Sequence, residues 1–327
     1  MDASNALGEF LRARRRLVRP EDVGIGTQGT RRVEGLRREE VAMLAGISTD
    51  YYLRLEQGRD RNPSSQVLDA IARALTLDQD AADHLICLTQ AQGNRASARP
   101  RSRGRAPRPE QVPQSIRELI DGWSGNPAWV QNRFFDVLAV NDLAAALSPS
   151  YAPGVNLLSA AFLDPSERER RRDWEAMTHA GVATLRALAG PDVDDPRLTE
   201  LVGDLSLRSD RFRDLWARHD VATHTAGVAR LRHPQAGDLE LRSHKLTIAG
   251  SGGLILGVFH PEPGSRSAEL LQMLGNLSAS GRTAAGEDRD RLSAPERWAK
   301  RAGPRSHEAR QLRMLRHTAP RRRKQRG

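Results

Sequence analysis

Cysteine is almost absent from this chain, whose 327 residues include Cys87 and no second cysteine. A lone cysteine excludes a disulfide framework and any multi-cysteine zinc or iron–sulfur site, and it fits a reducing compartment. The chain also lacks any run approaching about 18 apolar residues, so it predicts no bilayer-spanning helix. The opening segment, MDASNALGEFLRARRR, has no apolar stretch typical of a secretory signal. We therefore expect a soluble cytoplasmic protein.

Net positive charge is lacking in most of the chain, although the whole chain carries +10. Residues 1–91 sum to −1 and residues 114–274 to −4, whereas residues 92–113 carry +5 and residues 275–327 carry +10. The two basic segments are rich in Pro, Gly, Ser and Arg, which predicts a flexible linker and a disordered tail. Such cationic arms attract polyanions, with nucleic acid as the first candidate, although they also serve solubility alone.

The first 91 residues predict a helical domain with a tight corner between two of its helices. One helix is expected over residues 38–45, and Gly46 supplies the left-handed residue that ends it. Ser48 then caps a second helix over residues 49–57. This spacing is typical of a DNA-binding helix-turn-helix.

The residues around this corner are similar to a known family. The run REEVAMLAGISTDYYLRLEQGR resembles the lambda-repressor-like, Xre-type regulators. The flanking runs LGEFLRARRR, GLRREEVAMLAGIS and PSSQVLDAIARALTLD resemble the subset of that family with an MmyB-like ligand-binding domain. The resemblance covers nearly all of residues 5–91 and implies a five-helix fold. It also implies that residues 49–57 are the recognition helix, whose N-terminal half enters the major groove.

The same resemblance implies which side chains meet the bases. Thr49, Asp50 and Arg54 match the base-reading positions, and Arg54 can donate two hydrogen bonds to guanine. Asp50 either accepts from cytosine or caps its own helix, and both interpretations stay open. Tyr51 lies beside them and is expected to pack on a sugar or a thymine methyl. The full set of expected DNA contacts is Arg38, Ser48, Thr49, Asp50, Tyr51, Arg54, Arg59 and Arg61.

Charged residues at the edge of this motif have different expected roles. Arg38, Arg59 and Arg61 match positions at which the family touches phosphate. Glu56 is predicted to be structural and to pair with an arginine of the first helix such as Arg15, because DNA would repel its carboxylate. The alternative is a protein-docking module with exposed arginines. The net charge of −1 requires a locally polarised DNA-binding face.

Residues 114–274 predict a second domain of the α+β class. Two strands are expected near residues 128–132 and 135–141, followed by a block of helices. Leu239 and Leu241 then alternate with charged residues, which predicts a half-buried strand. The apolar segment LILGVFH predicts a central strand, and SAELLQML predicts a closing helix.

This half of the chain also resembles the MmyB-like ligand-binding domain. The similar segments include NPAWVQNRFFDVLAVNDLAAAL, NLLSAAFLDP, LVGDLSLRSDRFRDLWARHDV, HPQAGDLEL and PEPGSRSAELL. The resemblance implies a PAS-like fold, in which an antiparallel sheet and the helices over one face enclose an apolar cavity. It further implies a fatty-acid-like or other small apolar effector, and no cofactor is expected.

A ligand cavity has apolar walls and a few fixed polar groups. The expected wall residues are Trp129, Val137, Trp174, Phe212 and Trp216. Arg218 or His219 is the expected anchor for a carboxylate. For each aromatic residue, a place in the ordinary hydrophobic core is the competing explanation and the more frequent one.

Four residues with catalytic or metal-binding chemistry gather late in the chain, namely His219, Asp220, His224 and His233. Their spacing does not resemble the helical H-E-x-x-H pattern of zinc sites. No glycine-rich phosphate loop or G-x-S-x-G elbow appears in the sequence. We predict a protein that is neither an enzyme nor a metal binder, with a cationic His219 at a helix C-terminus. An enzyme using His219 and Asp220 is a distant alternative.

Together these features predict a transcription regulator that binds double-stranded DNA as a homodimer on the nucleoid, without contacting a membrane. Residues 1–91 would bind DNA, residues 92–113 would link the domains, and residues 114–274 would sense a small apolar ligand. Residues 275–327 would form a basic tail. The alternative keeps the DNA-binding half but makes residues 114–274 a ligand-free module for dimerisation or for a protein partner.

Overall fold

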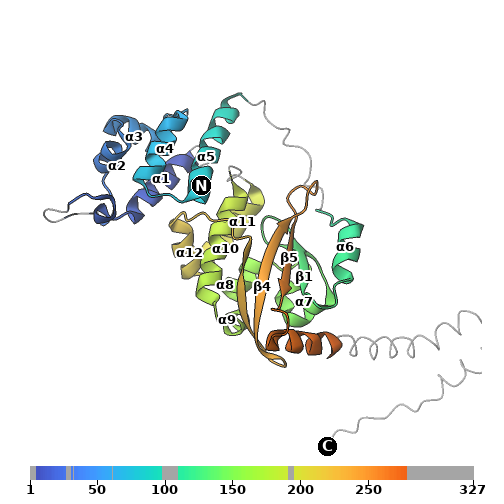
Figure 1. Cartoon of the computed structure of the whole chain (residues 1–327). Coiled ribbons are helices and arrows are strands. Elements are labelled where there is room, and N and C mark those ends of the chain that lie inside the picture. The colour runs from blue at the N-terminus through green and yellow to red at the C-terminus, as the bar shows by residue number, and fades with distance from the viewer. Residues whose placement is uncertain are drawn as a thin grey trace, which may run out of the picture. The chain divides into compact units, whose positions relative to one another are not determined.

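The computed structural model describes residues 5–26, 31, 33–60, 62–97, 110–190 and 195–277 (Figure 1). The expected flexible linker lies only partly within these ranges. Residues 92–97 continue the last helix of the N-terminal region, so that part of the linker prediction was wrong. Linker residues 98–109 and the tail from residue 278 lie outside the described residues, whereas linker residues 110–113 are described and Val112 is buried in a core of the C-terminal region.

The N-terminal region is helical, as predicted. Its α-helices are α1 (Ala6–Leu17), α2 (Arg38–Ala45), α3 (Thr49–Glu56), α4 (Ser65–Ala74) and α5 (Gln79–Ser97), with a short 3₁₀ helix over Pro20–Val23. Apolar residues at helical spacing on each helix turn toward one shared core, which buries them. That core includes Leu7, Phe10, Leu36, Val41, Tyr52, Leu55, Ile71 and Leu75.

The predicted corner between α2 and α3 is confirmed. Gly46 adopts a left-handed φ of 67°, which a residue with a Cβ rarely adopts. The Ser48 hydroxyl accepts a hydrogen bond of 3.1 Å from the Tyr51 backbone N–H and so caps α3. Leu44, which helical spacing places on the inner face of α2, instead has 36% of its surface exposed.

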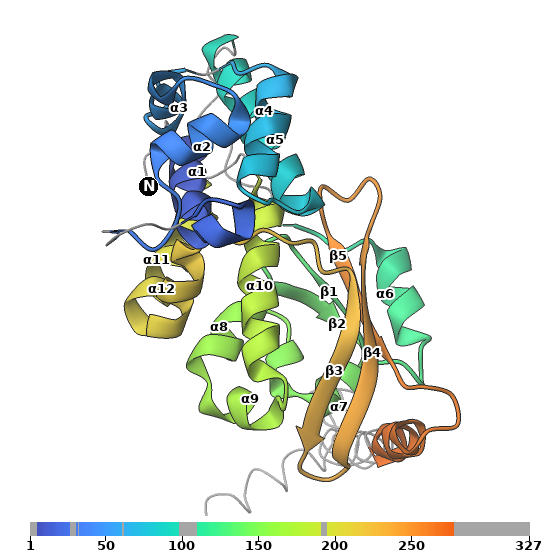
Figure 2. The ribbon, with the colours of Figure 1, turned by 60° about the vertical axis from the view of Figure 1, so that its left-hand side comes forward.

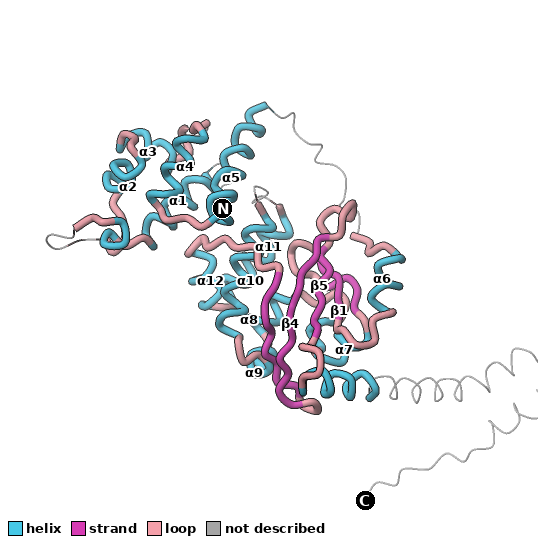
Figure 3. Tube along the Cα trace, in the orientation of Figure 1, coloured by secondary structure: helices cyan, strands magenta, loops and turns pink. Residues whose placement is uncertain are grey.

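The C-terminal region combines a sheet with helices on both sides. Its helices are α6 (Gln114–Asp121), α7 (Asp142–Leu147), α8 (Leu157–Leu163), α9 (Pro165–Arg170), α10 (Trp174–Ala189), α11 (Pro196–Arg208), α12 (Asp210–Ala217), a 3₁₀ helix over Pro149–Tyr151 and a closing helix over residues 266–277. Its strands are β1 (Ala128–Gln131), β2 (Val137–Val140), β3 (Ala226–His233), β4 (Gly237–Thr247) and β5 (Ile255–His260). All these strands lie in the C-terminal region, after residue 127 (Figure 3).

The five strands form one antiparallel sheet in the order β2-β1-β5-β4-β3. On β4, Leu239 and Leu241 are buried while their charged neighbours are exposed, which confirms the predicted alternation. Ile120 of α6 packs on one face with Ala128 and Val130. Helices α8 and α10 cover the opposite face (Figure 2). The sheet therefore has a distinct face toward α8 and α10, where a cavity can form.

The described residues up to Gly275 belong to one compact unit. Within it, the segment that follows α12 contacts α1 and α5. Arg14 of α1 donates to the Asp220 carboxylate over 2.6 Å. The Thr223 backbone N–H and hydroxyl donate to Asp80 of α5 over 2.7 and 2.9 Å. Val221, with 5% of its surface exposed, joins the apolar core of the N-terminal helices.

Candidate functional site

Helix α3 presents a polar face to the exterior. Thr49 and Asp50 are exposed at its first turn, and the Arg54 side chain keeps 42% of its surface exposed. Arg54 forms an ion pair with Asp50 one turn earlier, and its guanidinium carbon lies 5.5 Å from the Tyr51 ring centroid. Asp50 therefore pairs with Arg54, a role that neither sequence interpretation included. The pair holds Arg54 on the outer surface of the helix.

A buried carboxylate fixes the orientation of α3. Glu56 has 1% of its side-chain surface exposed and accepts from Arg15 Nε over 2.8 Å and from Arg38 Nε over 2.7 Å. The predicted pairing of Glu56 with Arg15 is confirmed. Burial by itself would raise the pKa of Glu56, but the hydrogen bonds from Arg15 and Arg38 outweigh it and lower that pKa. Helix α3 is thus tied to α1 and α2 by charged groups.

The other expected DNA contacts lie around this helix. Arg38 uses Nε for Glu56, and its side chain remains 45% exposed. Arg59 is exposed, and its backbone N–H donates to the Arg54 carbonyl over 2.9 Å to close the end of α3. Ser48 serves as the helix cap. Arg61 lies outside the described residues. Of the three phosphate candidates, the structure therefore brings Arg38 and Arg59 to opposite ends of the motif.

A cavity of about 330 Å³, which we name the sheet cavity, lies between the sheet and helices α8 and α10. Residues from the sheet, from the loops and from both helices supply its walls. Its apolar lining includes Trp129, Phe135, Tyr151, Leu157, Leu158, Met177 and Phe259. This volume lies within the usual range of small-molecule sites. The sheet cavity is therefore large enough for a small apolar ligand.

Several polar groups interrupt the apolar lining. Arg171 donates from Nη2 to the Tyr151 hydroxyl over 2.7 Å, and its Nε, which makes no hydrogen bond, lies 3.9 Å from the Glu167 carboxylate. Gln131 accepts from the Trp129 indole N–H over 2.7 Å, while its amide nitrogen is buried without a partner. One oxygen of Asp173 is also buried without a partner. Buried polar atoms without partners are costly, so the Gln131 and Arg171 nitrogens favour a bound acceptor, whereas the Asp173 oxygen favours a donor.

Lys245 of β4 is the most informative residue of the sheet cavity. Its ammonium nitrogen lies 5.5 Å from the Phe135 ring centroid. Burial, and secondarily the charge of Arg171, lower the pKa of Lys245. Among the described residues, no carboxylate lies within ion-pair distance of this ammonium. An anion in the cavity would compensate the buried charge.

The backbone of Phe135 has an unusual conformation, which positions its ring beside Lys245. Its φ of 70° lies in the left-handed region, where bulky side chains are rare. The Phe135 N–H donates to the Asn132 carbonyl over 3.1 Å, and its own carbonyl accepts from Leu157 N–H over 2.9 Å. These bonds hold the strained backbone and place the Phe135 ring beside Lys245. Strained residues of this kind concentrate at ligand sites.

The residues expected to line one ligand cavity are dispersed in the structure. Trp129 lines the sheet cavity. Val137 and Phe212 are fully buried in two different apolar cores, and neither lines the sheet cavity. The Trp174 ring centroid lies 4.5 Å from the guanidinium carbon of Arg168 and 4.7 Å from that of Arg211. Arg218 pairs with Asp220 over 2.7 Å and does not line the sheet cavity, so it is no anchor there.

Trp216 and His219 instead line a second, smaller cavity, which adjoins α1 and α5. The expectation of a cationic His219 was wrong. Burial, and then the charge of Arg186, lower the pKa of His219 to about 3. His224 lines the sheet cavity, while His233 contacts the Ala146 carbonyl, so the four residues His219, Asp220, His224 and His233 do not converge. The described part of the chain holds no cluster arranged to bind a metal.

Sequence reasoning overlooked Lys245 and Arg171, although one signal was present. Only three of the 51 basic residues are lysines, and Lys245 is the one that falls within residues 1–299. A lysine in an arginine-dominated chain singles out a position where a compact ammonium is needed. Arg171 gave no comparable signal, because it lies within the charged run RERRR.

Comparison with known proteins gives two matches along the chain. Residues 112–274 match the family model described as the MmyB-like transcription regulator ligand binding domain. Residues 6–85 match the model of a helix-turn-helix domain. The search of curated proteins found no match. Across the described residues, every helix is too short or too polar to traverse a bilayer.

Proposed function

We propose, from the premise that this chain is a DNA-binding transcription regulator with a helix-turn-helix and an MmyB-like ligand-binding domain, that its sheet cavity senses an amphipathic anion. The ligand has an apolar body and a carboxylate head, as a fatty acid does. The observation that carries this proposal is the partly buried Lys245, which lines the cavity and has no carboxylate within ion-pair distance among the described residues. Ligand binding regulates the protein if the ligand has different affinities for its DNA-competent and DNA-incompetent states.

The polar and apolar parts of the lining support this class of ligand. The carboxylate would pair with Lys245 and accept a hydrogen bond from the unpartnered Gln131 amide. The apolar body would lie along Trp129, Leu158 and Met177. The strand order β2-β1-β5-β4-β3 also supports a PAS-like arrangement of this domain.

On the DNA side, we propose an Xre-type mode of binding. The exposed Thr49 and Asp50, together with Arg54, would read base edges in the major groove. Arg38 and Arg59 would contact phosphates. A homodimer would place two α3 helices on half-sites about one helical turn apart. The protein would then act on the nucleoid in the cytoplasm, without catalysing a reaction.

The ligand proposal is tested by comparing an acid with its neutral amide. The full chain is expected to bind decanoate more tightly than decanamide in calorimetric titrations. Lys245→Gln should weaken decanoate binding at least about tenfold, since a hydrogen bond to a charged group contributes about 1.5–3 kcal/mol. Binding of decanamide should change little, because the neutral amide forms no ion pair with Lys245.

A matched control comes from the same strand. Arg242 of β4 is about half exposed and pairs with Glu262, so Arg242→Gln should leave decanoate binding unchanged. Equal affinities for acid and amide would contradict the proposed anionic head. If neither compound bound, and mass spectrometry of the purified chain found no co-purifying lipid, the ligand-free dimerisation or partner module would be favoured instead.

A further inference from the structure

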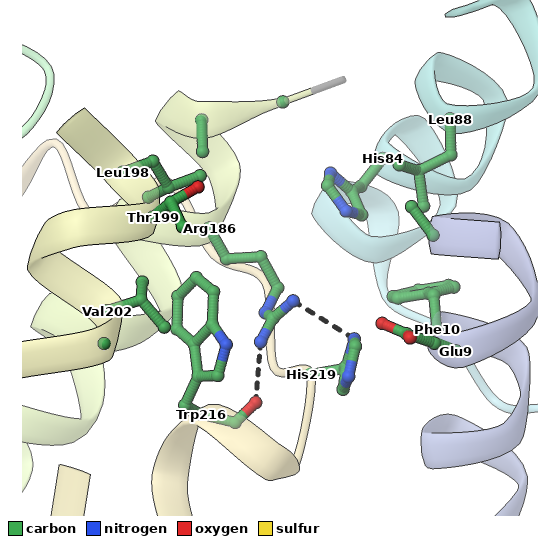
Figure 4. Close-up of a pocket in the computed structure, with 14 residues that line it drawn as sticks. Glu9, Phe10, His84, Leu88, Arg186, Leu198, Thr199, Val202, Trp216 and His219 are labelled. Atoms are coloured by element: carbon green, nitrogen blue, oxygen red, sulfur yellow. Dashed lines mark hydrogen bonds between the residues drawn. The ribbon is translucent and has the colours of Figure 1, made fainter. Parts of the chain in front are cut away.

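The smaller cavity has a volume of about 190 Å³, and we name it the junction cavity. Helices of both matched domains contribute to its lining (Figure 4). Helix α1 contributes Glu9 and Phe10, and helix α5 contributes His84 and Leu88. The C-terminal helices and the residues after α12 contribute the rest, which include Arg186, Leu198, Val202, Trp216 and His219. Most of this surface is apolar. A cavity of about 150 Å³ takes up benzene in another protein, so this one can hold a single ring or a short chain.

Arg186 is the principal polar group of the junction cavity. It lies between Trp216 and His219 in Figure 4, with 7% of its surface exposed. Its Nη2 donates to the Trp216 carbonyl over 2.6 Å, and its Nη1 lies 3.1 Å from His219 Nδ1. Its guanidinium carbon lies 3.9 Å from the Trp216 ring centroid. These contacts fix the guanidinium in position without neutralising its charge.

Two hydrogen-bond donors at this place are unused. Arg186 Nε and the Trp216 indole N–H are both buried without a partner. Each residue is more than nine-tenths buried, with 7% of its surface exposed. A buried donor without an acceptor costs about 1–3 kcal/mol, and more when it is charged. Such donors favour an acceptor, and a charged acceptor most of all.

The surrounding carboxylates do not supply that acceptor. Within the described ranges, no carboxylate forms an ion pair with Arg186. Asp220 is already engaged by Arg14 and Arg218, and Glu9 attracts Arg186 only from beyond ion-pair distance. This unbalanced burial lowers the pKa of Arg186 to about 9. The junction cavity is thus a mainly apolar space that holds one buried cation without an ion-pair partner among the described residues, with the Glu9 carboxylate on its wall.

We propose that the junction cavity is a second effector site, which binds a small monocarboxylate with an apolar body. The carboxylate accepts hydrogen bonds from Arg186 Nε and from the Trp216 indole N–H, and the apolar body contacts Phe10, Leu88 and Val202. This site is separate from the sheet cavity, and it does not depend on the ligand proposed there.

The site has a direct structural route to the recognition helix. Phe10 of α1 lines the junction cavity, and Arg15 of the same helix bonds to Glu56 at the end of α3. Gly8 of α1 also packs so closely on α3 that an added Cβ would lie 2.0 Å from the Glu56 carbonyl oxygen. A monocarboxylate between α1 and the C-terminal helices would therefore alter the packing of α1, the helix that positions α3.

Three acids and one neutral analogue test the proposal on the full chain: benzoate, phenylacetate, hexanoate and benzamide. Calorimetric titration should show saturable binding of at least one acid and much weaker binding of benzamide. Trp216→Phe keeps an aromatic side chain, although a smaller one, and removes the N–H, so it should weaken acid binding at least about tenfold. Arg186→Gln should abolish acid binding. Arg213→Gln, an exposed change on the same helix as Trp216, should leave acid binding unchanged.

The Lys245→Gln variant distinguishes this site from the sheet cavity. The small acids should bind Lys245→Gln as they bind the parent, whatever happens to decanoate. Absence of saturable binding of all three acids by the parent would overturn the proposal. Binding that survives Trp216→Phe unchanged, or that is lost in Lys245→Gln, would also overturn it. If Arg186→Gln fails to fold, Trp216→Phe and Lys245→Gln still decide the question.

Discussion

The indole of Trp129 on β1 lies across the backbone of Gly257, its direct partner on β5. A Cβ at Gly257 would lie 2.3 Å from Cε2 and Cζ2 of that ring, well inside van der Waals contact. The same indole lines the sheet cavity and is held by the Gln131 side chain. The missing side chain at Gly257 therefore sets the position of one cavity wall.

Gly257→Ala is expected to displace Trp129 and to disturb the sheet cavity. Overpacking a filled site costs about 1–3 kcal/mol, so the free energy of unfolding in urea should fall by that amount. Decanoate affinity should fall as well. Gly125→Ala is the control, because a Cβ there meets open space. Equal stability of Gly257→Ala and the parent would mean that the Trp129 ring moves away at no cost.

Arg54→Ala is expected to relax sequence choice at one base pair of each half-site. Loss of a bidentate contact to guanine should remove about 1–3 kcal/mol of discrimination, measured by selection from a randomised DNA library. Arg73→Ala is the control, since Arg73 is exposed on α4 and does not belong to α3. Identical selection profiles for Arg54→Ala and the parent would exclude Arg54 from base reading.

Glu56→Gln is expected to destabilise the N-terminal helices strongly. Removing one partner of a buried ion pair costs about 3–5 kcal/mol, here because Arg15 would be left buried and unpaired. The lowered pKa of Glu56 means that its carboxylate stabilises the fold above the unfolded pKa of about 4.3. This contribution is lost as the pH falls through the lower folded value. Urea unfolding of the parent and Glu56→Gln should therefore differ most at pH 7 and converge in acid.

His84 should also make the protein less stable in acid, because it is neutral in the folded state and becomes charged on unfolding. Burial, and then the charge of Arg186, lower its pKa to about 4, against about 6.5 in the unfolded chain. Between these values the unfolded state binds the proton and the folded state does not, so stability falls as the pH falls below about 6.5. The expected slope is about 1.4 kcal/mol per pH unit.

The measurement is urea unfolding between pH 7 and pH 4.5, comparing His84→Gln with the parent. The variant should show a shallower loss of stability on acidification. His224→Gln, at an exposed position, is the control and should retain the steeper slope of the parent. A slope unchanged by His84→Gln would mean that His84 becomes protonated in the folded protein at about its ordinary pKa.

Asn141→Ala is expected to lower the free energy of unfolding by about 3 kcal/mol. The Asn141 side chain is 3% exposed, and its oxygen accepts from the backbone N–H groups of Ala128 and Ala144, each over 3.0 Å. Its amide donates to the carbonyls of Ile120 and Asn126. Losing these bonds leaves several buried groups without hydrogen-bond partners and removes the cap of α7. Asn62→Ala, at an exposed position, should change stability little.

The helical corner of the N-terminal region was predictable because its signals are local. Gly46 provides the left-handed turn and Ser48 the cap, each within a few residues of the helix it controls. The pairing of Arg15 with Glu56 was also predictable, since a carboxylate near DNA needs a cation. The ion pair of Asp50 with Arg54 was missed, although their spacing of one helical turn permits it.

The ligand-site prediction was less successful because a cavity is assembled from distant segments. Hydrophobic pattern shows that Trp129, Val137 and Phe212 are buried, but it does not show which buried side chains face an empty space. Arg171 reaches the sheet cavity because the loop after α9 pairs with Leu231 of β3. Lys245 reaches it from β4. No local pattern connects these two residues.

The sequence by itself determined the two-part organisation, the helix-turn-helix corner and the strand pattern of the C-terminal sheet, because periodicity, caps and turns act over a few residues. Only the tertiary structure decided which cations are buried without partners. Arg186 resembles any other basic residue in the sequence, and the rarity of lysine marks Lys245 without showing that it lines a cavity. Their chemical importance arises from packing, since charge becomes costly only where surrounding segments exclude water and supply no carboxylate.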